Sequence, residues 1–303
     1  MRCQRLYPIA ALFLVPLLAF SQPRLMRQQH FKKHIPAGNY SGITPLGNER
    51  YAVVSDKSKE DGFFVFRLHI DTLQGIITKA ENEGFYSCGQ KNRDMEGIVY
   101  CPHTRTLFIC GEGDNAVYEY TLEGQRTGRQ LEMPNCFKSA PRNLGLEALT
   151  YDTLRHRFYI TSERLLPGDS LLRLQSFGDN LKPDRQYFYQ PDKPISRKYY
   201  HGVSELCATG DGRLLVMERQ LRVPRLKIGA KSIVRIYEVE PKENSFLEKR
   251  LLTEFTTRIS LTSRRFANYE GLCTPYQGWL LLVADSQNQY KGILRDWFKL
   301  IAE

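Results

Sequence analysis

The chain has 303 residues and a formal net charge of +10 at pH 7, and it is rich in aromatic residues, with 17 tyrosines and 16 phenylalanines. The positive charge favours anionic partners. However, no helix or aromatic platform gathers it into one stripe, which argues against a nucleic-acid-binding protein. No segment approaches the roughly 18 uninterrupted apolar residues of a membrane span, so no transmembrane segment is expected.

The N-terminal residues have the pattern of an export signal. Two arginines precede an apolar run that ends at Phe20, and Ala19 and Ser21 are small residues of the kind signal peptidase requires before its cleavage site. The apolar run is too short to span a bilayer. We therefore expect residues 1–21 to be removed. Residues 22–303 should then form one secreted or periplasmic domain, which we expect to be monomeric.

The rest of the chain is dominated by a repeat. Each copy begins with a marker residue, followed by an apolar run, a turn and a second apolar strand that ends at a charged acid. The markers in chain order are Ser41, Glu96, Glu147, Glu205 and Glu270. The acids are Asp56, Glu112, Glu163, Glu218 and Asp285, at offsets of 15, 16, 16, 13 and 15 residues from the markers. This regularity is typical of a repeat architecture.

Two further strands can be recognised in most copies. Third strands are expected at Phe63–Ile70, Ala116–Leu122, Ser170–Ser176, Ser232–Glu240 and Trp297–Ala302. Fourth strands are expected at Gly75–Ala80, Arg129–Met133, Arg185–Tyr189 and Lys249–Phe255. Four antiparallel strands per repeat describe the blade of a β-propeller.

The repeat length predicts the number of blades. Ser41 and Glu270 are 229 residues apart over four intervals, or about 57 residues per repeat. Five such repeats need about 286 residues, and residues 22–303 supply 282, so a single all-β propeller of five blades is favoured over one of six. The last repeat lacks a fourth strand. We expect the stretch Leu25–Ile35 to provide it and so to close the ring.

The marker glutamates and the strand-end acids should meet at one mouth of the central channel. The innermost strand of a blade lines the channel, and the second strand runs antiparallel to it, so the start of one lies beside the end of the other. Carboxylates this close must be protonated, paired with bases or bound to a cation. Oxygen ligands without histidine suit Ca²⁺ or Mg²⁺ rather than zinc. Alternatively, the same acids bond backbone N–H groups or arginines and fasten neighbouring blades together.

Basic residues that lie close to these acids in the sequence are candidates for holding an anionic small molecule or ester substrate. They are Arg93, Arg164, His201, Arg219 and Arg265. The run from Arg219 to Arg235 contains several basic residues and no acid. We expect it to include a loop inserted in the fourth repeat, which is either solvated or grips an anion over the mouth.

Several blocks of sequence carry a family resemblance. The segments Asp94–Ile98, Gly145–Leu149, Glu205–Arg219 and Asn268–Asp285, taken in order, resemble the phytase-like esterase family of propellers and the related exported propellers called SdiA-regulated. The resemblance covers essentially all of residues 22–303. It implies hydrolysis of phosphate or other esters, and calcium held at the channel. Ser41 departs from the glutamate pattern, so a fully symmetric metal ring is not expected.

The sequence leaves two functions open. The first is a metal-dependent hydrolase of phosphate or carboxylic esters, with the cation at the mouth. The second is a non-catalytic propeller that binds a ligand or a protein partner in the cell envelope, and the fold cannot decide between them. No catalytic residue can be assigned.

The cysteines leave a further alternative open. Cys101, Cys110, Cys207 and Cys273 lie within apolar strands and are expected to be small buried hydrophobic residues. Export would permit disulfides, and one bridge between Cys88 and Cys136 is an alternative to two free thiols.

Overall fold

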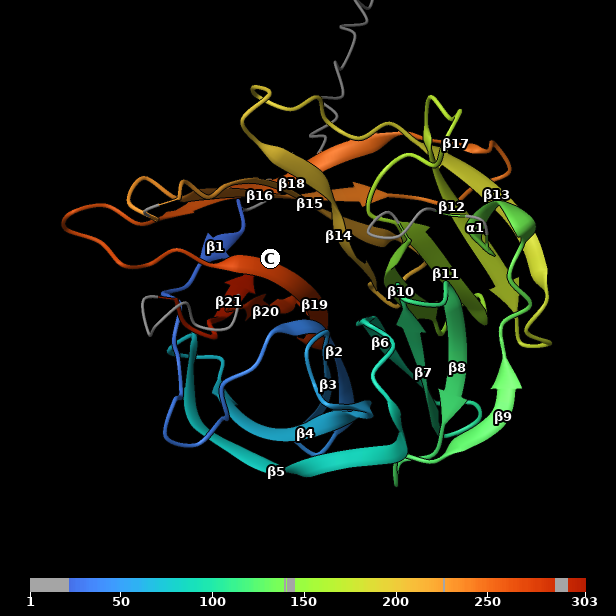
Figure 1. Cartoon of the computed structure of the whole chain (residues 1–303), viewed down its shortest axis with the longest axis horizontal. Helices are drawn as coiled ribbons and strands as arrows, with labels where there is room; N and C mark the ends of the chain where they lie inside the picture. Colours follow the sequence, from blue (N-terminus) through green and yellow to red (C-terminus); the bar gives the residue numbers. More distant parts are fainter. Residues whose placement is uncertain (1–21, 139, 141–144, 226, 287–293) are drawn as a thin grey trace, which may run out of the picture.

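The protein is an all-β propeller with five blades, as the repeat length predicted. The structure, a computed structural model, describes residues 22–138, 140, 145–225, 227–286 and 294–303. Its five sheets surround a central axis (Figure 1). The expected signal peptide lies outside the described residues. Among the described residues, no helix has the length and apolar character needed to cross a membrane.

The first three blades each contain four strands in sequence order, with the first strand innermost. Blade 1 consists of β2 (Tyr40–Gly47), β3 (Arg50–Ser55), β4 (Glu60–Asp71) and β5 (Ile76–Lys91). Blade 2 consists of β6 (Met95–Cys101), β7 (Thr106–Gly111), β8 (Ala116–Tyr120) and β9 (Arg126–Gln130), followed by the short helix α1 (Asn135–Lys138). Blade 3 consists of β10 (Leu146–Asp152), β11 (Arg157–Ser162), β12 (Leu172–Gly178) and β13 (Pro183–Tyr189), and β17 (Phe246–Leu247) pairs in parallel with β13.

The last two blades complete the ring. Blade 4 consists of β14 (Tyr200–Ala208), β15 (Leu214–Arg222), β16 (Lys231–Val239) and β18 (Lys249–Arg258). Blade 5 consists of β19 (Asn268–Tyr276), β20 (Trp279–Asp285) and β21 (Phe298–Ala302), and its outer strand is β1 (Arg24–Leu25), which pairs antiparallel with β21. Figure 1 shows β1, in blue, beside β21, in red. The N-terminal segment therefore closes the ring as predicted, although its paired strand is shorter than Leu25–Ile35.

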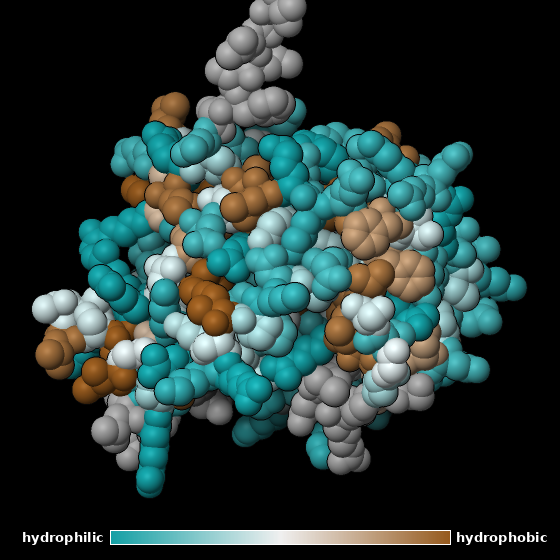
Figure 2. Space-filling view, turned by 90° about the horizontal axis from the view of Figure 1, so that it is seen from above, coloured by the Kyte–Doolittle hydropathy of each residue, from teal (hydrophilic) through white to brown (hydrophobic). Residues whose placement is uncertain are grey.

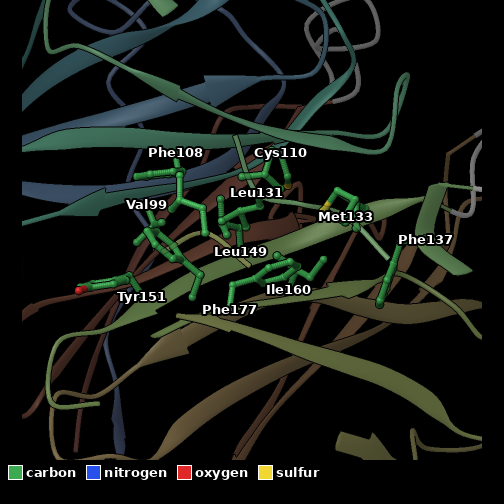
Figure 3. Packing of buried hydrophobic residues seen from close by; sticks show 14 of the residues in the cluster. Val99, Phe108, Cys110, Leu131, Met133, Phe137, Leu149, Tyr151, Ile160 and Phe177 are labelled. Carbon is green, nitrogen blue, oxygen red and sulfur yellow. The ribbon is translucent and has the colours of Figure 1, made fainter. Parts of the chain in front are cut away.

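Apolar layers between neighbouring blades form the core. All seven residues of β10 are buried because an inner strand is covered on both faces, whereas the outer strand β9 is mostly exposed. Between blades 2 and 3, Phe108 packs with Leu149, Ile160 and Phe177 (Figure 3). Four other clusters occupy the remaining interfaces in the same way. Burial of these apolar faces is the main force that holds the blades together.

The bridge between Cys88 and Cys136 is not formed, and neither residue takes part in a disulfide. Cys88 lies in β5 of blade 1, whereas Cys136 lies in α1, with its sulfur 4.0 Å from Gln186 Nε2 of blade 3. The two residues therefore belong to different parts of the ring. The four other described cysteines are buried in strands, as expected.

Candidate functional site

Each innermost strand carries a β-bulge near its start, at one mouth of the channel. A bulge leaves one or two residues out of the regular pairing and re-aims their side chains. The residues set apart in this way include Ser41, Glu96, Glu147, Ser204 and Glu270. The bulges coincide with the predicted markers in four blades. In blade 4, the bulge lies at Ser204, one residue before the predicted marker Glu205.

The same one-residue shift changes which residue of blade 4 takes the place of the strand-end acid. Asp285 pairs with Asn268 in blade 5, and Arg219 pairs with Gly202 at the corresponding place in blade 4. Arg219 therefore stands where the other blades have Asp56, Glu112, Glu163 and Asp285. The spacing contained this information, because Ser204 to Arg219 is 15 residues, like the other blades, whereas the predicted pair in blade 4 is 13 residues apart. Arg219 was predicted as a basic candidate, but its place in the ring was not.

Arg219 is the cationic centre of the mouth. Its side chain is 7% exposed, and its guanidinium donates to Glu270, to Glu163 Oε1 at 3.1 Å and to Glu147 Oε1 at 3.3 Å. It also donates to Asn268 Oδ1 at 2.7 Å. Burial raises the pKa of Glu270 to about 8, although Arg219 acts in the opposite direction. One arginine thus joins acids of blades 3 and 5 to blade 4.

A second group of acids at the mouth lies beside blades 1 and 2. The carboxylate oxygens of Asp56, Asp94 and Glu96 lie within 4.8 Å of one another. Glu96 is 8% exposed, and its side chain makes no hydrogen bond or ion pair with a described residue. Burial, together with repulsion from Glu147 and nearby acids, raises the pKa of Glu96 well above its ordinary value. The Glu96 carboxylate therefore lies among other acids at the mouth without a neutralising partner among the described residues.

Asp56 and Asp94 are held in place by one asparagine. Asn92 Nδ2 donates to the carbonyls of Asp56 at 3.2 Å and Ser58 at 2.7 Å, and its Oδ1 accepts from the backbone N–H of Asp94 at 2.6 Å. Asp56 Oδ1 is buried without a hydrogen-bond partner. Lys57 Nζ lies 2.8 Å from Asp56 Oδ2 and 2.9 Å from Asp94 Oδ1, on the exposed side of the cluster.

Asp94 was missed by the sequence reasoning, although it is the first residue of the block that contains Glu96. It lies two residues before the bulge, and its backbone carbonyl accepts from Glu112 N at 2.8 Å, which places it opposite Glu112 at the mouth. Asn39 and Asn268 occupy comparable places in blades 1 and 5, since the carbonyl of Asn39 accepts from Asp56 N at 3.3 Å and Asn268 pairs with Asp285. A third ring position, two residues before the bulge, therefore supplies a polar side chain in blades 1, 2 and 5, whereas blades 3 and 4 have Gly145 and Gly202 there.

Glu205 does not join the acids at the mouth. It occupies the place that Gly42, Gly97, Ala148 and Gly271 have in the other inner strands. A Cβ added at Gly97 would lie 2.9 Å from Leu149 N, so there is no room for a side chain there. The Glu205 carboxylate accepts from the backbone N–H of Leu206 at 3.0 Å and Leu149 at 3.4 Å, and burial raises its pKa well above the ordinary value. It links inner strands rather than facing the mouth.

Glu218 also lies away from the mouth. Its carboxylate accepts from Tyr189 OH at 2.5 Å, from Asp192 N at 2.9 Å and from Lys249 Nζ at 2.8 Å. Successive residues of a strand point to opposite faces. Because the side chain of Arg219 points toward the channel mouth, that of Glu218 points away from it.

The remaining predicted acids belong to the mouth. Glu112 accepts from Gly145 N at 3.2 Å, Glu163 accepts from Arg219 and from Tyr200 OH, and Asp285 accepts from Asn268 Nδ2 at 3.2 Å.

Arg93 lines a pocket of about 470 Å³ beside this cluster, together with Asp56, Lys57, Lys91 and Asp94. However, its side chain is only 6% exposed and donates to the carboxylates of Asp61 at 3.2 Å and Asp114 at 2.6 Å and to the carbonyl of Ile109 at 3.0 Å. These bonds tie blade 1 to blade 2. The exposed cations of the pocket are Lys57 and Lys91.

The other basic candidates lie near blades 4 and 5. The guanidinium of Arg164 lies 3.6 Å from the centre of the Tyr200 ring, and its Nε donates to the carbonyl of His201 at 3.1 Å. Burial and the charge of Arg164 lower the pKa of His201. Arg265 is exposed in the connection before β19, where its carbonyl accepts from Gln28.

These features define a class: a five-bladed propeller whose channel mouth is lined by buried carboxylates. Residues 35–287 match the model of the family described as "Phytase-like: Esterase-like activity of phytase". The chain therefore belongs to this phytase-like family. The comparison with curated proteins found no match.

Solved structures with a similar arrangement have diverse functions. A streptogramin B lyase shares 11% sequence identity, with 91% of this chain and 97% of that chain covered and a TM-score of 0.42. The PQQ-bound aldose sugar dehydrogenase from Streptomyces coelicolor shares 12%, with 92% and 98% covered and a TM-score of 0.44. A chain of a nidogen/laminin complex shares 13%, with 84% and 74% covered and a TM-score of 0.42.

Proposed function

We propose that this protein is an exported, divalent-cation-dependent hydrolase of phosphate or carboxylic esters that acts at the carboxylate mouth. The observation that carries the proposal is Glu96, a carboxylate that is 8% exposed, has no partner among the described residues and lies within 4.8 Å of Asp56 and Asp94. A buried carboxylate of this kind is costly unless it is protonated or bound to a cation.

The donor set fits a hard cation. Asp56, Asp94 and Glu96 offer only oxygen ligands, which suits Ca²⁺ or Mg²⁺. The unpartnered Oδ1 of Asp56 supplies one such oxygen without breaking a bond. Lys57 is 52% exposed in its side chain and bridges Asp56 and Asp94 from the solvent side, so it can move outward when a cation enters.

The adjacent pocket supplies a place for the substrate. Lys57 and Lys91 give positive charge to its wall, and they can hold the anionic group of an ester beside the acids. A divalent cation, when bound, supplies Lewis acidity toward the ester oxygen and lowers the pKa of water. Glu112 is half-buried with a raised pKa, and its backbone is fixed by Asp94, so it is the acid of this group best suited to accept a proton.

The test is hydrolysis of p-nitrophenyl phosphate, phytate and short acyl esters, with and without Ca²⁺. We expect turnover to depend on the cation. If Glu96 and Asp94 hold that cation, the variants Glu96→Gln and Asp94→Asn should each lose turnover by at least about a hundredfold. Glu123→Gln, which changes an exposed acid outside the mouth, should leave turnover unchanged. Hydrolysis that is unaffected by EDTA and by both variants would exclude the proposal.

A second candidate function is non-catalytic binding of an anionic ligand or a cell-envelope partner. Arg219 favours it, because this arginine already neutralises three acids of the predicted ring and leaves fewer of them for a metal. Binding of Ca²⁺ without turnover on any of these esters would favour this candidate.

A further inference from the structure

Three connections at the mouth end of blades 3 to 5 share one composition. We call them the rim loops: residues 190–199 between β13 and β14, 223–225 with 227–230 between β15 and β16, and 259–267 between β18 and β19. All three follow strands that end at the mouth or precede strands that start there. The structure describes each of them except residue 226.

The rim loops and the strand ends beside them are strongly basic. They carry exposed cations that form no ion pair with a described residue, namely Lys193, Arg197, Lys198, Arg222, Arg225, Arg258, Arg264 and Arg265. Their one acid, Asp192, is bound to Arg235 and Lys249. The uncompensated charge is therefore positive and faces solvent.

Each rim loop also exposes a large aliphatic side chain. Leu261 is 92% exposed, Ile228 is 58% exposed and Ile195 is 56% exposed. Figure 2 shows that apolar residues interrupt a mostly hydrophilic surface, and that some of them project at the edge of the molecule. Large exposed aliphatic side chains and unpaired cations therefore occur together in all three rim loops.

The rim loops are held together as one surface. Two backbone hydrogen bonds join the second loop to the third: Gly229 N donates to the carbonyl of Ile259 at 3.0 Å, and Ile259 N donates to the carbonyl of Ala230 at 2.9 Å. Leu221, at the end of β15, packs in the same small cluster as Ala230 and Ile259. Its neighbour Gln220 accepts from Ile195 N at 2.8 Å, which attaches the first loop.

We propose that the rim loops dock the propeller on an anionic lipid surface, with the cations at the headgroups and the three aliphatic side chains in the acyl boundary. Interfacial binding of this kind combines buried apolar area with attraction to anionic lipids. A soluble polyanion would be satisfied by the cations but would leave Leu261, Ile228 and Ile195 in water. Docking would turn the mouth toward the membrane, and it does not depend on the proposed hydrolysis.

The test is sedimentation of residues 22–303 with vesicles of phosphatidylcholine alone or mixed with phosphatidylglycerol. Residues 1–21 are omitted because their apolar run would itself bind lipid, and all five sheets lie outside them. We expect the protein to bind the anionic vesicles at about 0.15 M salt. We expect this binding to be lost at about 1 M salt, because the Debye length falls from about 8 to about 3 Å.

Two kinds of variant separate lipid docking from simple charge attraction. Arg264→Gln with Arg265→Gln should weaken partitioning on the order of tenfold or more, at about fivefold per cation. Leu261→Ser should weaken it roughly tenfold, while Leu73→Ser, at an equally exposed leucine in the β4–β5 turn of the opposite face, should have no effect.

Three outcomes would overturn the proposal. They are no preference for anionic vesicles, equal effects of Leu261→Ser and Leu73→Ser, or binding to dextran sulfate that matches binding to vesicles and ignores Leu261. The last result would assign the rim loops to a soluble polyanion instead.

Discussion

At the scale of single residues, Arg219 explains how so many acids share one mouth. Charges buried together are tolerated when each has a partner, and removal of one partner leaves the others uncompensated. Arg219 pairs with Glu147, Glu163 and Glu270, but the structure leaves Glu96 outside this network. The mouth therefore divides into a neutralised half beside blades 3 to 5 and an acidic half beside blades 1 and 2.

Replacement of Arg219 should be strongly destabilising. Arg219→Met should lower the free energy of unfolding by about 3–5 kcal/mol, because three buried carboxylates lose their cation. Arg219→Lys should recover only part of the loss, since an ammonium group cannot reproduce the forked contacts. Urea unfolding measures both, with Arg265→Gln at the exposed rim as the control, expected within about 0.5 kcal/mol of the parent. A loss for Arg219→Met no larger than for the control would contradict the network.

The metal-free protein should become less stable as pH rises from about 4.5 to about 8. Glu96 and Glu147 have a native pKa raised well above the ordinary value, and that of Glu270 is about 8. Within this window the native state binds more protons than the unfolded chain, so the free energy of unfolding falls as pH increases. His30 and His201 act in the opposite direction near pH 6, because their lowered pKa means that the native state binds fewer protons there. They are only two groups, so the acids should dominate.

Thermal unfolding in EDTA at pH 5.5 and pH 8.5 measures this slope. The melting temperature should be lower at the higher pH, and Glu147→Gln should reduce the difference while Glu123→Gln preserves it. A melting temperature that rises across this range would show that the carboxylates are already ionised and satisfied in the native state.

At the scale of elements, closure of the ring depends on very few residues. β1 contributes a two-residue strand, and Gln29 then forms a bridge to Phe298 in β21. The side chain of Gln29 also reaches blade 1, where its Oε1 accepts from Ile77 N at 2.8 Å and its Nε2 donates to Ile77 O at 3.0 Å. One glutamine thereby joins the last blade to the outer strand of the first.

In Gln29→Leu, the junction between blades 5 and 1 should unfold locally more readily than the rest of the molecule. It removes two hydrogen bonds and leaves the Ile77 backbone groups unsatisfied, at a cost of about 1–3 kcal/mol. Hydrogen exchange should then speed up in β1, β5 and β21 first. Gln74→Leu, at an exposed turn of blade 1, is the control. Uniform acceleration in all five blades would mean that Gln29 has no special part in closure.

The sequence predicted the elements better than their register. The blade number, the closing strand and most strands follow from apolar runs and spacing, which are local properties. The fourth strand of blade 2 was expected at Arg129–Met133 but lies at Arg126–Gln130, because its outer position leaves little apolar signal. Glu205 and Glu218 were misplaced because Ser204 and Arg219 do not resemble the acids they replace. Asp94 aligns with Asn39 and Asn268 in the repeat, but the absence of a constant acid at this position hid its part in the site. The contact between Glu147 and Arg219 depends on tertiary packing that a repeat alignment does not contain.

At the scale of the whole molecule, the face that contains the channel mouth has an acidic region and a basic region. The acids of blades 1 and 2 gather at the channel, while the unpaired cations of the rim loops lie at the edge of blades 3 to 5. Glu205 lies in the inner strand of blade 4 and accepts from the backbone N–H of Leu149 in blade 3, so it joins two blades rather than adding to the charge of the mouth. The acids at the channel suit a bound cation, and the cations around them suit an anionic group that approaches from the same face.

The most direct test of the cation site is the melting temperature of Glu96→Gln and the parent at pH 8, each in EDTA and in Ca²⁺. In EDTA the variant should melt higher, because its neutral amide avoids the cost that the parent has at pH 8 of either ionising Glu96 among buried acids or keeping it protonated. Ca²⁺ at a hundredfold excess over its dissociation constant should stabilise the parent by about 2.7 kcal/mol, or roughly 2–4 °C for each kcal/mol. The variant should gain little, so the order of the two melting temperatures should reverse. An equal response of both proteins to Ca²⁺, or none in either, would contradict a cation site built on Glu96.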